Sequence, residues 1–167
     1  HDPGILERVA TRVYEVKDGG CREVIAVVRD AAGAPEATLL GLGDRVPALA
    51  AALANGALSH ALNYDDVSAG GAGHMGVTSI PAALAVAEKR GGVSGKEFLA
   101  ALAAGCEVMA RIGAAIKRAE QGYTEAKPQP TQMPGYFSCA AAAGRVLGLA
   151  PARMESRSGA SGSPRRR

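Results

Sequence analysis

Between residues 98 and 116, apolar or small residues recur at alternating spacings of four and three positions, and this repeat constrains the fold more than any other part of the sequence. Its members are Phe98, Leu102, Gly105, Met109, Ile112 and Ile116. The spacing places them on one face of an α-helix, as a seam that packs against neighbouring helices, and the glycine permits a close approach. Ser94 and Glu97 stand before the seam as an S-x-x-E capping box, so the helix is expected to begin there.

Segments on both sides of this helix, separated by glycines, also carry helical patterns. Helices are expected from Asp2 to the glycines at 19 and 20, over 21–32, from Pro47 onwards, from Ser79 and Pro81 to Gly91, and over 138–147. The pattern fails between 36 and 47, which predicts a short strand or hairpin, and a loop with three prolines is expected over 122–135. Aromatic residues make up only 4% of the chain, so the core must be built from aliphatic side chains. The sequence therefore predicts a mainly α fold, a bundle of several helices.

The length of 167 residues fits one domain. We expect a helical domain over residues 1–152 and a disordered basic tail over 153–167, because the tail is rich in serine, glycine and arginine and has no apolar period. The tail holds five arginines and one glutamate, a balance of +4, whereas the whole chain carries +3, so the rest of the chain carries −1. A tail that binds nucleic acid through its phosphates is an alternative. We favour a solvated terminus and expect no nucleic-acid partner.

The three cysteines, Cys21, Cys106 and Cys139, are far apart and form no C-x-x-C pair, which argues against a disulfide framework and a structural zinc site. Free thiols favour a reducing compartment. The longest uncharged stretch, 46–64, is mostly alanine and contains polar residues, so we interpret it as a buried helix of a soluble protein and not as a membrane span. No signal peptide is recognised, so a cytoplasmic location is expected, and the start at His1 indicates a fragment.

The residues suited to chemistry gather between 55 and 76. Asp65 and Asp66 stand at the carboxyl end of an alanine-rich helix, whose partial negative charge opposes carboxylates, and a glycine-rich loop then carries His74. A local conflict of this kind is typical of a functional or strained site. A carboxylate removed from water beside another negative group has a raised pKa, and a histidine titrates near neutrality, so the segment predicts acid–base catalysis. Adjacent residues do not share a helix face, so one aspartate is expected to act and the other to cap.

Plainer interpretations of the same residues stay open. Asp66 could equally be an ordinary turn or cap residue. His60, with alanine and leucine neighbours, is interpreted as a hydrogen-bonded core histidine, and for His74 a functional and a structural role are evenly matched. Asp65, Asp66 and His74 could bind a divalent metal ion, but their spacing is irregular, and we expect an organic site without a metal.

Three ordered blocks of the sequence resemble a known family. They are NGALSHALNYDDV at 55–67, GHMGVTSIPAALAVAEKRGGVSGKEFLAALAAGCEVMARIGAA at 73–115 and PTQMPGYFSCAAAAGRVLGL at 130–149. Together they look like the first domain of the MmgE/PrpD family, which includes 2-methylcitrate dehydratase, cis-aconitate decarboxylase and iminodisuccinate epimerase. The resemblance covers roughly residues 36–154, and three blocks with consistent spacing are more specific than a single short motif.

The resemblance implies an all-helical domain that forms a homodimer, which in full-length relatives is completed by a smaller α+β domain. It also implies a small di- or tricarboxylate substrate, no metal or organic cofactor, and chemistry that removes or moves a proton next to a carboxylate. The chain departs from the family pattern at three positions: Asn63 stands where the family has aspartate, Val67 where it often has threonine, and Gln129 where a histidine is expected. Glutamine can bind a substrate but cannot transfer a proton.

The leading hypothesis is therefore a fragment of a lyase or isomerase that acts on a small polycarboxylate and is an enzyme in its full-length form. Asp65 or Asp66 would be the base, and His74 the acid or a ligand of a substrate carboxylate. The pocket would be lined by Asn63, Gln129 and Thr131. The competing hypothesis is a catalytically silent helical module for dimerisation or interaction, favoured by Asn63, Gln129 and the missing downstream region.

Overall fold

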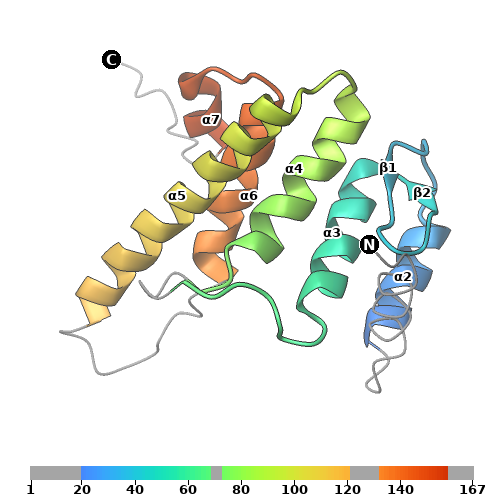
Figure 1. Cartoon of the computed structure of the whole chain (residues 1–167), viewed down its shortest axis with the longest axis horizontal. Coiled ribbons are helices and arrows are strands. Elements are labelled where there is room, and N and C mark those ends of the chain that lie inside the picture. The colour runs from blue at the N-terminus through green and yellow to red at the C-terminus, as the bar shows by residue number, and fades with distance from the viewer. Residues whose placement is uncertain (1–19, 69–72, 121–131, 158–167) are drawn as a thin grey trace, which may run out of the picture.

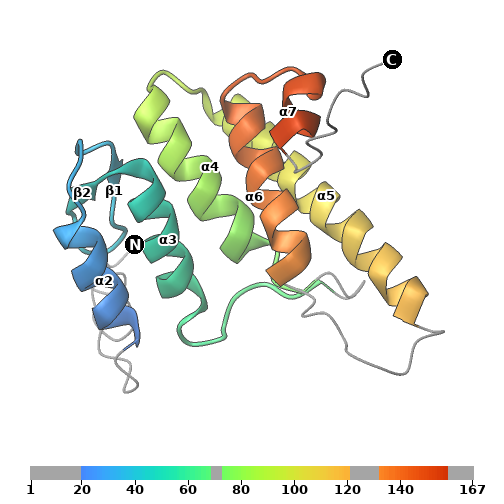
Figure 2. The same cartoon turned by 180° about the vertical axis from the view of Figure 1, so that it is seen from behind.

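The computed structural model describes residues 20–68, 73–120 and 132–157, and most of its regular structure is helical. The helices are α2 (Gly20–Asp30), α3 (Ala48–His60), α4 (Gly76–Arg90), α5 (Gly95–Glu120), α6 (Gln132–Val146) and α7 (Pro151–Arg157). Figure 1 shows α2, α3, α4, α6 and α5 following one another across the molecule, and the view from behind in Figure 2 agrees. The predicted mainly α fold is confirmed. The helix predicted to start at Asp2 lies outside the described residues.

The predicted excursion between α2 and α3 is a two-stranded antiparallel hairpin. Its strands are β1 (Ala37–Thr38) and β2 (Arg45–Val46), with Ala37 opposite Val46. The buried side chain of Asn55 in α3 ties this hairpin to the bundle, because its Oδ1 accepts from the Leu40 N–H and its Nδ2 donates to the Thr38 carbonyl, both at 2.9 Å. One amide thus satisfies two backbone groups of the hairpin.

Two apolar clusters lie on either side of α4. The first joins the hairpin, α2 and α3 to α4, and its buried members are Val28, Ala37, Leu39, Val46, Ala48, Ala51, Ala54 and Ala85. The second joins α4 to α5 and α6, and its buried members are Ala83, Ala101, Ala142 and Val146. Because Ala83 and Ala85 are both on α4, this helix contributes to both clusters and is the central element of the bundle. Alanine dominates both clusters, as the shortage of aromatic residues predicts.

Helix α5 begins as the capping box predicts. The Glu97 N–H donates to Ser94 Oγ at 3.2 Å, and the Glu97 carboxylate accepts from the Ser94 N–H at 3.0 Å. The predicted seam faces the bundle, with Gly105 and Met109 buried and with Phe98 and Leu102 packed against the second cluster. Among the described residues, 95–116 of α5 has the length and apolar composition of a membrane-crossing helix. Helix α5 packs along α6 and α4, and 22% of its most apolar window is buried.

Helix α3, which was expected to be buried, is buried on one face only. Ala51 and Ala54 are inaccessible to solvent, whereas Leu49 and Leu53 are 85% and 60% exposed. The uncharged composition of the segment therefore reflects two different faces: small residues that allow close packing against the hairpin and α4, and exposed leucines.

Three predicted boundaries differ from the structure. Helix α4 begins at Gly76, earlier than predicted, so Pro81 lies inside it. Helix α6 begins at Gln132, so Pro134 lies in its first turn, where a missing N–H costs no hydrogen bond, and not in a loop. Helix α7 extends to Arg157, into the segment predicted to be a disordered tail, and the rest of that tail lies outside the described residues.

Candidate functional site

The chain turns back on itself where α3 ends. The Asn63 N–H donates to the His60 carbonyl at 2.9 Å. Asn63 has a φ of 50°, in the left-handed region that asparagine tolerates better than most residues and that commonly terminates helices. This turn brings Asp65 back toward His60, the last residue of the helix.

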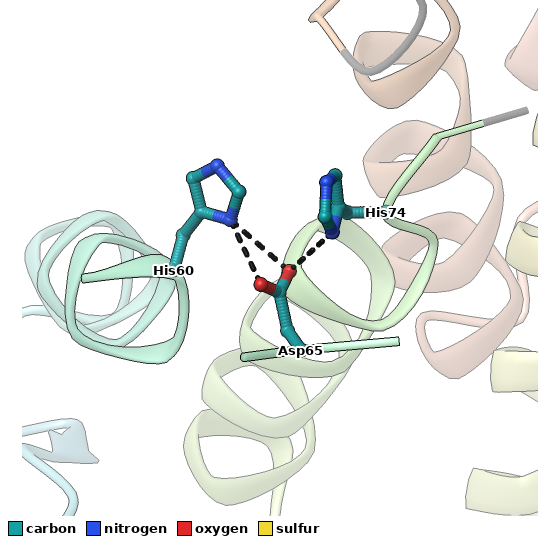
Figure 3. Close-up of side chains that lie close together, drawn as sticks. All are labelled: His60, Asp65 and His74. Atoms are coloured by element: carbon teal, nitrogen blue, oxygen red, sulfur yellow. Dashed lines mark hydrogen bonds and ion pairs between the residues drawn. The ribbon is translucent and has the colours of Figure 1, made fainter. Parts of the chain in front are cut away.

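Asp65 contacts two imidazole rings. Its Oδ1 is 3.0 Å from Nδ1 of His60, and its Oδ2 is 3.0 Å from Nδ1 of His74. Figure 3 shows the two rings side by side above the carboxylate, and their centroids are 4.7 Å apart. The Asp65 side chain is 10% exposed, that of His74 19% and that of His60 46%, so solvent reaches the group mainly at His60. We call these three residues the histidine–carboxylate cluster.

A short bridge places His74 in the cluster. The Ser68 N–H donates to the Gly73 carbonyl at 3.1 Å, in an isolated antiparallel pairing. His74 follows directly, and α4 begins at Gly76. The bridge therefore fixes the two ends of the glycine-rich segment and holds His74 beside Asp65.

Asp66 has a different environment from its neighbour. Its two carboxylate oxygens accept the Gly76 N–H at 2.9 and 3.0 Å, at the amino terminus of α4. A negative charge is favourable at this end of a helix, where N–H groups lack partners. The conflict between paired carboxylates and the carboxyl end of α3 is thus resolved, because Asp66 caps the next helix and Asp65 faces imidazoles.

The pKa of Asp65 reflects these neighbours. Burial raises it, but the hydrogen bond from His60, a backbone N–H and the positive charge of the two histidines lower it, and the resulting pKa is below the ordinary value of 3.8. The prediction of a raised pKa was therefore wrong for Asp65, because the hydrogen bond from His60 and the other lowering interactions outweigh burial. Asp65 stays ionised at neutral pH. A carboxylate with so low a pKa is a weak base there and is better suited to orienting an imidazole.

The structure separates the predicted site residues into four groups. Asp65 and His74 meet, and Asp66 caps α4. Asn63 lies exposed on the turn beside the cluster. The two predicted pocket residues after α5, Gln129 and Thr131, lie outside the described residues.

His60 is the cluster member that the sequence interpretation missed. It was interpreted as a core histidine, but its side chain is almost half exposed and contacts Asp65. The signal in the sequence was its place at the end of a helix, ahead of an asparagine that can reverse the chain. Contact with a residue five positions later depends on that reversal and not on helical periodicity.

The fold and the cluster define a helical domain that carries paired histidines around an ionised carboxylate. The sequence model of the MmgE/PrpD N-terminal domain matches residues 5–165, and the chain belongs to this family. A curated relative, the cis-aconitate decarboxylase-like protein oryM of Aspergillus oryzae, is 32% identical over 125 residues. That similarity covers 71% of this chain and 26% of the relative, so the chain spans only a part of the relative's length.

Proposed function

We propose that this chain is the helical part of a lyase or isomerase that moves a proton on a small di- or tricarboxylate, without a cofactor. The observation that carries the proposal is the position of Asp65, within 3.0 Å of an Nδ1 atom of both His60 and His74. Membership of the MmgE/PrpD family supports a lyase or dehydratase type. The similarity to a cis-aconitate decarboxylase-like protein supports an unsaturated tricarboxylate such as cis-aconitate as substrate.

Proton transfer is assigned to His74. Its Nδ1 faces Asp65 at 3.0 Å, so Nε2 is the nitrogen that the proposal assigns to the substrate. An ionised carboxylate on the far side of an imidazole fixes the orientation of the ring and stabilises the imidazolium that forms when the ring takes up a proton. The low pKa of Asp65 and the contact of Asp66 with Gly76 argue against either aspartate as the base.

His60 is assigned to the substrate's carboxylate groups. It is the most exposed member of the cluster and shares Asp65 with His74. An imidazole that takes up a proton becomes a cation, and a cation beside the substrate favours an anionic ligand. The interaction is stronger in a partly buried site than in water.

The proposal is tested by incubating the full-length protein that contains this helical part with cis-aconitate or 2-methylcitrate and following the ultraviolet absorbance of the unsaturated acid. We expect turnover in the unmodified protein and in Asp66→Asn, whose amide oxygen still accepts the Gly76 N–H. His74→Asn should be slower by roughly 10²- to 10⁴-fold, the usual contribution of a general acid or base. Equal rates in His74→Asn and the unmodified protein would exclude His74 as the proton-transferring group.

A second candidate, a catalytically silent module, is favoured by Asn63. This residue stands where the family has an aspartate, and its left-handed backbone gives asparagine a structural reason to be there. A folded protein that turns over neither cis-aconitate nor 2-methylcitrate would support the silent module. The homodimer, the absence of membrane and nucleic-acid partners and the cytoplasmic location stay predictions.

A further inference from the structure

We propose that the histidine–carboxylate cluster also binds a divalent transition-metal ion. The members are His60, Asp65 and His74, and one potential ligand atom of each lies within 4.8 Å of the others. The sequence interpretation considered Asp65, Asp66 and His74 as a set, but the structure places Asp66 at the amino terminus of α4 and puts His60 in its place. Two imidazole nitrogens and one carboxylate form a different and more suitable donor set.

The spacing of the donors fits a common coordination sphere. Protein nitrogen and oxygen ligands lie about 2.0–2.2 Å from zinc, so neighbouring donors around one ion are roughly 3–3.5 Å apart. The Nδ1 atoms of His60 and His74 are each 3.0 Å from an oxygen of Asp65. In Figure 3 both of these nitrogen atoms are turned toward the carboxylate. An ion bound by all three residues requires the donor atoms to close from a spread of up to 4.8 Å to about 3–3.5 Å.

The chemistry of the donors selects the class of ion. Imidazole favours zinc, cobalt, nickel, copper and iron, whereas magnesium and calcium prefer sites made of oxygen alone. Three protein ligands leave at least one position for water. His60 is 46% exposed, so an ion can reach the cluster from solvent on that side.

Binding requires the Nδ1 lone pairs of both histidines. A metal ligand must present an unprotonated nitrogen, so a doubly protonated ring releases its Nδ1 proton to solvent and keeps the one on Nε2, whereas a neutral ring protonated on Nδ1 changes tautomer and carries its proton on Nε2 instead. The metal ion then replaces the protons as the positive charge beside Asp65.

Metal binding and proton transfer are mutually exclusive at this cluster. An ion on Nδ1 of His74 withdraws electron density from the ring and cancels the orienting role of Asp65, so zinc should inhibit turnover and a chelator should restore it. This inhibitory part rests on the proposed function. The binding itself does not, because it is measured on the chain without substrate.

The test is a titration of the purified chain with Co²⁺, followed by the visible absorption of the bound ion. His1 is replaced by alanine in every protein, because an amino-terminal histidine chelates metals by itself. We expect one bound equivalent in the parent chain. Removing even an outer partner of a metal ligand lowers affinity roughly 10- to 100-fold, so His60→Ala and His74→Ala should each lower it by at least about tenfold. Asp66→Asn is the matched control, with unchanged affinity expected.

A second measurement uses the parent chain alone, so that it does not depend on the folding of a variant. Zinc added to ¹⁵N-labelled protein should shift the Nδ1 resonances of His60 and His74 together. The proposal is overturned if excess Co²⁺ gives no visible band, if both histidine variants bind as well as the parent, or if thiolate charge-transfer absorption places the ion on a cysteine. Metal binding without turnover would contradict only the proposed function, and turnover without metal binding would contradict only this inference.

Discussion

At the scale of single residues, Asp66 and Gly76 form a contact that leaves no space for a side chain. The carboxylate of Asp66 accepts a hydrogen bond from the Gly76 N–H, and a Cβ added to Gly76 would clash with Asp66 Oδ1. The glycine is therefore required by close approach and not by an unusual backbone angle. Gly76 is also the first residue of α4, the helix that contributes to both apolar clusters, so this contact connects the site to the core.

Gly76→Ala is expected to destabilise the chain by about 1 kcal/mol, the typical cost of losing a helix cap, because the methyl group displaces the carboxylate from the N–H. Chemical denaturation followed by circular dichroism measures the change. Gly95→Ala is the matched control: Gly95 also begins a helix, and a Cβ there meets nothing within 4 Å. A variant at 76 as stable as the one at 95 would contradict the prediction.

At the scale of elements, α3 and α4 share an unusual way of starting. The residue before each helix, Pro47 or Met75, provides no side-chain cap. Each helix instead receives a carboxylate that is distant in sequence: Glu36 accepts the Ala48 N–H at 3.1 Å, and Asp66 accepts the Gly76 N–H. Helix α5, in contrast, is capped by its own Ser94 and Glu97. Local sequence patterns predict a cap formed by neighbouring residues, as in α5. They do not predict a cap formed by a carboxylate that is distant in sequence, as in α3 and α4.

Glu36 also makes the stability of the hairpin junction depend on pH. The hydrogen bond from Lys89, 3.0 Å away, and the Ala48 N–H hold the pKa of Glu36 below its ordinary value of 4.5. A carboxylate with a lowered folded-state pKa stabilises the fold at pH values above its unfolded-state pKa, and this contribution is lost as the pH falls through the folded-state value.

Glu36→Gln is therefore expected to be less stable than the parent at neutral pH, with a difference that shrinks below pH 4.5, the ordinary value. Denaturation midpoints measured across this range test the prediction. Glu107→Gln is the control, because Glu107 is 60% exposed and pairs with Arg111 on its own helix. A difference between Glu36→Gln and the parent that stays constant with pH would show that charge is not the cause.

At the scale of the whole molecule, the features that could be predicted from the sequence are those that depend on residues close together in the chain. The seam of α5, its capping box, the hairpin and the alanine core all follow from spacing and composition. The start of α4 was placed too late because it depends on a carboxylate ten positions earlier. The cluster was predicted in part: Asp65 and His74 were singled out, whereas His60 was assigned to the core because its contact depends on the turn at Asn63.

Helices α4, α5 and α6 pack against one another at Gly105, a residue of the apolar seam of α5. A Cβ added to Gly105 in α5 would lie 2.9 Å from the Cβ of Ala142, 3.0 Å from the Ser138 carbonyl oxygen and 3.1 Å from the Cβ of Ser79. The first two atoms belong to α6 and the third to α4, so three helices meet where only a hydrogen atom fits. Backbone and short side chains cannot rotate away, so an extra methyl group has to push the helices apart.

Gly105→Ala should therefore destabilise the chain by about 1–3 kcal/mol, the usual cost of overfilling a packed core, despite the better helix propensity of alanine. Gly56→Ala is the control, because a Cβ at Gly56 lies an ordinary 3.6 Å from the Val77 carbonyl oxygen. There the propensity gain, up to about 1 kcal/mol, should dominate. Opposite shifts of the two denaturation midpoints would show that the close approach of α4, α5 and α6 limits the stability of the bundle. A stabilising Gly105→Ala would mean that these helices are not held as close as the contacts require.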